Sequence, residues 1–110
     1  MQITWEDFEN VELRVGTIIA VEDFLEAKKP AYKLKIDFGK EIGIKVSSAQ
    51  IVELYKKEDL IGKQIIGVVN FPPKKIGPFV SETLTTGFYT DKGVVLAVPD
   101  KKAESGSKLL

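Results

Sequence analysis

In the stretch YKLKIDF, residues 32–38, apolar and polar side chains alternate without a break. A period of two is typical of a β-strand that is buried on one face only. The short segment GKE, residues 39–41, supplies a tight connection, and the alternation resumes over residues 42–46. We therefore expect residues 32–38 and 42–46 to pair as an antiparallel hairpin.

The sequence before this hairpin predicts a short helix, a long strand and a loop. Thr4 is followed by two carboxylates, a pattern typical of a capped helix start, so residues 4–9 are expected to be helical. Residues 11–21 alternate in the manner of a strand, and Gly16 marks an expected β-bulge that bends it. Residues 24–31 break the pattern with a proline and two lysines and are expected to form an exposed loop.

The sequence after the hairpin predicts one more helix and three more strands. Ile51, Leu54 and Tyr55 have the spacing of one helix face, and Ser47 or Ser48 can cap that helix. The remaining expected elements are a short turn at residues 56–62 and strands at residues 65–69, 83–89 and 94–98.

The order of these elements matches an OB-fold. We predict an all-β protein with short helices, built as a five-stranded Greek-key barrel with a helix between strands 3 and 4. Residues 1–110 are expected to form a single domain, with an N-terminal helix at residues 1–10 and a C-terminal extension at residues 99–110.

Composition excludes several classes of function. The 110 residues contain no cysteine and no histidine, which excludes disulfides, thiolate or imidazole metal sites and imidazole catalysis. Three pairs of carboxylates, at residues 6–7, 22–23 and 58–59, are adjacent in charged contexts typical of solvated faces, and no glycine-rich phosphate loop is present. We therefore expect no enzyme, no catalytic residues, no cofactor and no metal. No apolar run is long enough to span a bilayer, so we expect a cytoplasmic protein without membrane insertion.

The run NFPPKKIGPFVSE, residues 70–82, interrupts the β-like pattern with three prolines and two lysines. Because proline cannot donate a main-chain hydrogen bond, we expect the chain to leave the sheet near Phe71 and to rejoin regular structure after Ser81. The loop could protect a sheet edge or recognise a ligand, and the residues alone leave both open. Lys74 and Lys75 could attract phosphate, but with zero net charge such a site is expected to be weak unless a dimer doubles it.

Several motifs along the chain resemble, in order, the tRNA-binding domain family: LRVG at residues 13–16, PAYKL at 30–34, VSS at 46–48, GK at 62–63 and the run 70–82. Such modules occur as appendages of methionyl- and phenylalanyl-tRNA synthetases, in cytokine-like synthetase cofactors and as small free-standing homodimers. The motifs KPAYKL at residues 29–34 and SSAQI at 47–51 resemble the free-standing members. Those members are regarded as chaperone-like factors linked to protein export.

The resemblance implies a non-catalytic tRNA-binding OB-fold protein that acts as a protein-export-related chaperone. Its implied partners are tRNA, unfolded or export-bound polypeptides and a second copy of the chain. The alternative is a pure structured-RNA or tRNA-binding factor with no chaperone role. The synthetase appendages have aspartate and glycine in place of Tyr32 and Ser48, and glycine-methionine in place of Thr83-Leu84, so the RNA surface is expected to be altered.

Nine residues are candidates for RNA binding: Arg14, Lys33, Ser47, Ser48, Asn70, Lys74, Lys75, Ser81 and Glu82. For some of them a structural role is an open alternative. Arg14 could instead form an ion pair with Glu12, and Asn70 or Ser81 could cap a strand end. Glu82 repels phosphate, so it would have to accept from a base amino group or orient a lysine.

Aromatic residues exceed what one small barrel readily holds. The candidates for lining apolar peptide pockets are Tyr32, Phe71 and Phe79, and the candidates for a dimer interface are Trp5, Phe8, Leu109 and Leu110. The alternative for the interface candidates is that they cap the ends of the barrel.

Overall fold

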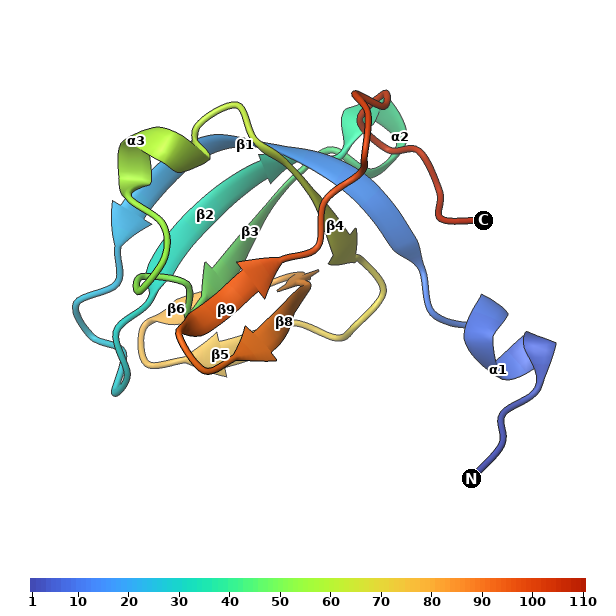
Figure 1. Ribbon diagram of the computed structural model, residues 1–110, viewed down its shortest axis with the longest axis horizontal. Coiled ribbons are helices and arrows are strands. Elements are labelled where there is room, and N and C mark those ends of the chain that lie inside the picture. The colour runs from blue at the N-terminus through green and yellow to red at the C-terminus, as the bar shows by residue number, and fades with distance from the viewer.

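Short strands dominate the computed structural model, which describes residues 1–110 (Figure 1). Its three helices contain only four or five residues each. The helices are α1 (Trp5–Glu9), α2 (Gly39–Ile42) and α3 (Lys57–Leu60), and the strands are β1 (Leu13–Asp23), β2 (Tyr32–Asp37), β3 (Ile44–Ala49), β4 (Gln64–Val68), β5 (Lys74–Ile76), β6 (Phe79–Ser81), β7 (Leu84–Thr85), β8 (Gly87–Thr90) and β9 (Gly93–Leu96).

Five antiparallel strands form the main sheet in the order β3-β2-β1-β4-β7. β1 is the longest strand and serves both sides of the sheet, because its Leu13–Thr17 half pairs with β4 and its Thr17–Asp23 half pairs with β2. The sheet curls along β1 into a barrel, with α3 between β3 and β4 (Figure 1).

Hydrogen bonds between the two outer strands nearly close this barrel. The hydroxyl oxygens of Ser47 in β3 and Thr85 in β7 lie 2.9 Å apart. The backbone N–H of Glu82, just before β7, donates to the carbonyl of Val46 at 2.9 Å. The predicted OB-fold, with its short helices and its helix between the third and fourth strands, is confirmed.

Glycine in β1 has a different role from the predicted one. The register between β1 and β2 shifts between Ile18 and Ala20, so the irregularity lies beyond Gly16, which pairs regularly with Ile65. A Cβ atom at Gly16 would lie 2.5 Å from Cγ2 of Ile36. The predicted bulge at Gly16 is therefore wrong, and glycine occurs there because the core leaves no room for a side chain.

The core follows from the alternation in residues 32–38. Leu34 and Ile36 are 1% and 0% exposed, whereas Lys33 and Lys35 face outward. β2 and β3 pair residue by residue, so the predicted hairpin forms. Its connection is the helix α2, however, and Ile44 and Val46 pair with Asp37 and Lys35 on the outer face, so the expected alternation over residues 42–46 is wrong. Burying one branched or aromatic side chain of this size contributes about 1.5–3 kcal/mol. The largest fully buried hydrophobic side chains are Ile18, Leu34, Ile36, Phe38, Leu60 and Ile65.

The predicted helix at residues 51–55 is wrong, because this segment forms turns and the helix begins only at Lys57. The serines expected to cap that helix lie in β3. Two tertiary hydrogen bonds hold Tyr55 outside a helix: its hydroxyl accepts from the N–H of Leu96 at 3.0 Å, and its carbonyl accepts from the hydroxyl of Tyr32 at 2.8 Å.

The run 70–82 is more regular than expected. β5 and β6 form a hairpin in which Lys74 pairs with Ser81 and Ile76 pairs with Phe79. Gly77, at φ 57°, makes the turn together with Pro78, so the third proline sits where no ladder hydrogen bond is needed. The expected strand at residues 83–89 is split into β7 and β8, and β8 pairs with β9 instead of continuing the barrel.

Both ends of the chain extend beyond the barrel. The Thr4 side chain accepts from the N–H of Asp7 and the Asp7 carboxylate accepts from the N–H of Thr4, which confirms the predicted helix cap. α1 stands away from the barrel and buries none of its residues (Figure 1). The C-terminal segment instead lies along β1, where the N–H of Leu109 donates to the carbonyl of Leu13 at 2.8 Å. None of the three helices has the length and hydrophobicity needed to cross a membrane.

Candidate nucleic-acid interface

Lys33 projects from β2 onto the outer face of the barrel, where aromatic rings surround it. Its ammonium nitrogen lies 5.0 Å from the ring centre of Phe24 and 5.5 Å from that of Phe79. The two rings meet edge to face, with their centres 5.3 Å apart. A carboxylate oxygen of Glu26 lies 3.7 Å from the same nitrogen. These contacts hold the charge in one place while a quarter of the side chain stays exposed, at 25%.

This arrangement lies where OB-folds bind oligonucleotides, on the face of the second and third strands and the loops beside it. Phe24 comes from the connection between β1 and β2, and Phe79 comes from the long connection between β4 and β7. The β1–β2 connection was expected to be exposed, but Phe24 and Ala31 are only 3% and 5% exposed. A hollow of about 260 Å³ beside Lys33 is lined by Glu22, Lys35 and Phe79, among others.

Ser48 is the serine that shares this outer face. It pairs directly with Lys33 across β2 and β3, and directly opposed residues project to the same side of a sheet. Ser47, one residue earlier, pairs with Leu34 on the inner face and is 0% exposed. Of the two candidate serines in β3, only Ser48 lies where it can meet a ligand.

Two other candidates join the edges of the barrel. The hydroxyl of Ser81 accepts from the N–H of Ser48 at 3.1 Å and donates to the carbonyl of Thr83 at 3.2 Å. A carboxylate oxygen of Glu82 accepts from the N–H of Val46 at 3.1 Å. The two side chains thus bind N–H groups of β3 that a neighbouring barrel strand would otherwise bind. In this way they help to hold the shape of the outer face around Lys33.

Asn70 fastens the N-terminal segment to the end of β4. Its side-chain oxygen accepts from the N–H of Glu12 at 3.0 Å, and its side-chain nitrogen donates to the carbonyl of Asn10 at 2.7 Å. Both hydrogen-bonding groups of the amide are therefore used within the chain.

Arg14 fastens the C-terminal segment. Its guanidinium donates to Glu12 at 2.6 and 3.0 Å and to the carbonyl of Gly106 at 2.9 Å, and Glu41 lies 3.7 Å away. The hydrogen bond from Arg14 holds the pKa of the Glu12 carboxyl below its usual range. Of the two alternatives for Arg14, the ion pair with Glu12 is formed.

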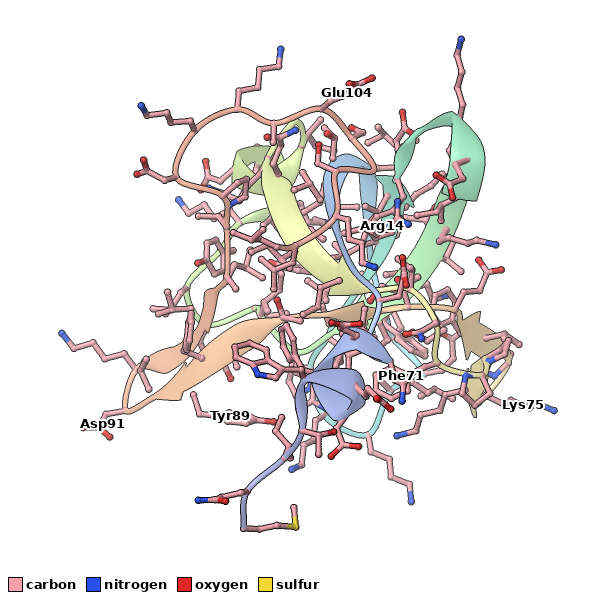
Figure 2. All side chains as sticks on the ribbon, turned by 90° about the vertical axis from the view of Figure 1, so that its right-hand side faces the viewer. Arg14, Phe71, Lys75, Tyr89, Asp91 and Glu104 are labelled. Carbon is pink, nitrogen blue, oxygen red and sulfur yellow. The ribbon has the colours of Figure 1, made fainter.

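Lys74 and Lys75 are both exposed on β5 and take part in no ion pair. Figure 2 shows Lys75 pointing away from the body of the molecule. Phe71, in the segment that leads into this hairpin, is 54% exposed. The hairpin offers two free cations, and the segment before it offers one open ring. Both lie beside the outer surface formed by Lys33, Glu26, Ser48 and Phe79, which we call the Lys33 face.

The remaining apolar candidates differ in their exposure. Tyr32 is 8% exposed and belongs to the core, with its hydroxyl bound to the carbonyl of Tyr55. By contrast, Trp5 is 84% exposed and Leu110 is 112% exposed. Phe8 and Leu109 are also exposed.

Residues 13–108 match the family described as "Putative tRNA binding domain". The chain belongs to this tRNA-binding domain family. Among curated relatives, the methionine–tRNA ligase of Pyrococcus horikoshii is 37% identical over 107 residues, which cover 97% of this chain and 14% of that enzyme. The methionine–tRNA ligase of Methanocaldococcus jannaschii is 38% identical over 109 residues, or 98% of this chain and 16% of that enzyme. The chain therefore spans only a small part of these ligases.

Solved structures of about the same length are also similar. The CsaA chaperone protein from Picrophilus torridus is 55% identical, with a TM-score of 0.94 and coverage of 99% of this chain and 100% of that one. The chaperone CsaA from Bacillus anthracis is 47% identical, with a TM-score of 0.94 and complete coverage, 100%, of both chains. A MetRS-related protein from Pyrococcus horikoshii is 26% identical, with a TM-score of 0.86. The resemblance to free-standing members of the tRNA-binding domain family is confirmed.

Sequence reasoning missed several residues of this tRNA-binding domain. Phe24 and Glu26 complete the surroundings of Lys33, and the aromatic type of residue 24 in a polar loop was the available signal. Phe88 and Tyr89 are 63% and 96% exposed on the β8–β9 hairpin. Figure 2 shows Tyr89 and Asp91 on the opposite side of the molecule from Lys75. Phe88 and Tyr89 therefore add apolar surface away from the Lys33 face.

Proposed function

We propose that this chain is a non-catalytic tRNA-binding protein of the CsaA type, and that the Lys33 face with the β5–β6 hairpin is where it holds RNA. The observation that carries the proposal is the placement of Lys33 between Phe24 and Phe79 on the face that OB-folds use. Aromatic rings can stack on unpaired bases, and ammonium groups attract phosphate.

The proposed roles divide the nine candidate residues into two groups. Lys33, Ser48, Lys74 and Lys75 have side chains on this face or its flanking hairpin, and we assign them to direct contact with RNA. The other candidates form hydrogen bonds within the chain, so we assign them to holding the face and the terminal segments in place: Arg14, Ser47, Asn70, Ser81 and Glu82.

A titration of labelled tRNA at several salt concentrations tests this function. We expect saturable binding at low ionic strength that weakens steeply with salt, because the proposed contacts are mainly to phosphate. Replacing both Lys74 and Lys75 with glutamine should reduce the slope of log affinity against log salt by about 1.4, at ~0.7 per single-strand phosphate contact. Absence of any complex at low salt would refute the proposal.

We further propose that the chain works as a homodimer in the cytoplasm, where tRNA is found. α1 presents Trp5, which is 84% exposed, and Phe8, which is 38% exposed, and the C-terminal end presents Leu109 and Leu110. A second copy would bury these side chains and would double the few cations of each RNA-binding face. Doubling matters because the net charge of one chain is zero.

A second candidate function, as a chaperone linked to protein export, is favoured by exposed apolar side chains and by the CsaA chaperones among similar structures. Phe71 is open to solvent, and Phe79 lines the hollow beside Lys33, so an unfolded polypeptide could place apolar side chains there. Light scattering of an aggregating client protein tests this function. We expect slower aggregation with the wild-type protein and less effect with Phe71→Ser, and no effect of the wild-type protein would refute the chaperone role.

A further inference from the structure

A basic cleft lies away from the Lys33 face, at the start of β4. Its volume is about 500 Å³, and only one of its nine lining residues is hydrophobic. Residues 62–64 form one wall, Thr17 of β1 lies beside them, and residues 98–102, which follow β9, form the other wall. Such a polar cleft does not suit an apolar peptide.

The cleft brings together three lysines: Lys63, Lys101 and Lys102. None of them forms an ion pair, although Lys33, Lys57 and Arg14 each do. The one carboxylate in the lining is that of Asp100, so the charged side chains of the cleft carry two net positive charges. In a chain whose total charge is zero, this is a local positive surplus that the protein does not neutralise.

The walls of the cleft are fixed before any ligand arrives. The side-chain amide of Gln64 accepts from the N–H of Ala103 at 3.0 Å and donates to the carbonyl of Ala103 at 2.6 Å. The hydroxyl of Thr17 lies 2.9 Å from that of Ser105. The Lys63 ammonium lies 6.0 Å from the ring centre of Tyr55. Walls held this way lose little conformational entropy when a ligand binds, so the remaining cost is that of ordering the exposed side chains of Lys101 and Lys102.

The cleft and the lysine hairpin lie toward opposite ends of β4. Gln64, the first residue of β4, borders the cleft, and the chain that leaves the last residue, Val68, leads to Lys74 and Lys75. The first and last of five antiparallel strand residues are about 14 Å apart. Figures 1 and 2 agree, since the segment around Glu104 lies at the top of both views and the hairpin with Lys75 lies lower. A ligand that meets both groups of lysines must be long and must carry several negative charges.

We propose that this cleft binds phosphate groups of the RNA backbone and is a second contact for the tRNA held on the Lys33 face. The inference rests on the proposed tRNA-binding function and adds a surface to it. Lysine ammonium groups act on phosphate as point charges and carry no base preference. The cleft therefore adds affinity and fixes the orientation of the RNA, whereas contacts to bases fall to the partly exposed Phe79 beside Lys33, because Phe24 is buried.

The test compares two triple variants in tRNA titrations over a range of salt concentrations. Lys63→Gln, Lys101→Gln and Lys102→Gln together remove the cleft charges. The matched control, Lys40→Gln, Lys56→Gln and Lys92→Gln, removes three exposed lysines that are outside both proposed contact surfaces. We expect the cleft variant to lower the salt slope by about 2, at ~0.7 per phosphate contact, and the control to leave it close to the wild-type value. Equal slopes for the two variants would overturn the inference.

A second measurement separates failure of the cleft from failure of the proposed function. Amide NMR spectra of the wild-type protein are recorded with tRNA and, separately, with inorganic phosphate. We expect tRNA to shift the amides of residues 62–64 and 100–102 in addition to those of the Lys33 face. Shifts at the Lys33 face alone overturn the cleft and leave the proposed function standing. If tRNA causes no shifts at all, the proposed function and the RNA contact at the cleft both fail. If phosphate shifts the amides of the cleft and tRNA does not, the cleft is a site for a free anion and the inference is overturned.

Discussion

At the residue scale, the proposed RNA-binding surface depends on Lys33 and on the side chains that surround it. Strand alternation alone predicts that this lysine faces outward. The structure adds two phenyl rings and a carboxylate around its ammonium group. An ordinary solvated lysine would lose considerable side-chain entropy on meeting a phosphate, and this one is already restrained.

Lys33→Met tests this residue, because methionine keeps the apolar stem between the rings and removes the charge. We expect weaker tRNA binding and a salt slope lower by about 0.7, which is the effect of one lost phosphate contact. The free energy of unfolding should change by less than about 1 kcal/mol, because a partly exposed ion pair contributes little. Lys40→Met on α2 is the control, and equal tRNA affinities of the two variants would contradict the role of Lys33.

Glu12 gives a prediction about pH. Its pKa is lowered in the folded protein by the hydrogen bond from Arg14, so the folded state favours the ionised carboxylate. This contribution to stability is present above the unfolded pKa of about 4.3 and is lost as the pH falls through the lower folded value. Urea unfolding at a series of pH values from about 6 down to about 3, a range that includes this window, measures the loss.

We expect the free energy of unfolding of Glu12→Gln to fall less steeply with decreasing pH than that of the wild-type protein. Glu9→Gln is the control, because Glu9 forms no ion pair. If wild-type protein and Glu12→Gln lose stability in parallel over the whole acid range, then the Glu12–Arg14 pair does not act as described.

At the scale of elements, side-chain hydrogen bonds close the part of the barrel between β3 and β7 that main-chain pairing leaves open. β7 has only two residues, so few main-chain bonds are available between the outer strands of the barrel. The hydroxyls of Ser47 and Thr85 meet there, and Ser81 and Glu82 bind backbone N–H groups of β3. The sequence motif that resembles an RNA-binding signature therefore also keeps the barrel closed.

A double-mutant cycle tests this closure. Ser47 is fully buried but its partner Thr85 is only half-buried, so Ser47→Ala should lower the free energy of unfolding by about 1 kcal/mol, the usual net contribution of one hydrogen bond. Thr85→Val removes the other hydroxyl and keeps the shape. We expect the double variant to lose clearly less than the two single losses together, as measured by urea unfolding. Strict additivity would show that the two hydroxyls do not interact.

The sequence predicts the elements whose pattern is local. The alternation of residues 32–38 and 42–46 predicts the β2–β3 hairpin, and Thr4 predicts the capped start of α1. Features that depend on distant contacts are not predicted. Tyr55 has helical spacing from Ile51 but is held outside a helix by hydrogen bonds to Leu96 in β9 and Tyr32 in β2.

The same distinction explains the candidate site. Outward-facing lysines follow from strand period and from exposed segments, so Lys33, Lys74 and Lys75 can be predicted from the sequence. The internal hydrogen bonds of Ser47 and Asn70 join segments far apart in the chain, and no local pattern reveals them. The same holds for the contact of Phe24 with Phe79.

At the scale of the whole molecule, the N-terminal helix has no role in the fold of a single chain. α1 buries none of its residues, and it is fastened to the barrel mainly through the segment that Asn70 binds. Exposed tryptophan and phenylalanine on such a helix are costly in water unless another surface covers them. A second copy of the chain is the proposed cover.

Trp5→Ala combined with Phe8→Ala tests this assembly by sedimentation equilibrium. We expect wild-type protein to have the mass of two chains and the double variant to shift toward one chain, with circular dichroism unchanged because neither side chain is buried. Leu25→Ala with Ile61→Ala is the control, since these exposed apolar residues lie outside the proposed interface. A monomeric wild-type protein would contradict the proposed homodimer.

In the proposed complex, tRNA lies across the Lys33 face and the β5–β6 hairpin. Mapping the amide NMR shifts of the isotope-labelled protein on addition of tRNA tests it most directly. We expect the largest shifts in β2, in the β1–β2 connection near Phe24 and in the hairpin from Lys74 to Ser81. Absence of shifts, or shifts that spare both β2 and the hairpin, would contradict it.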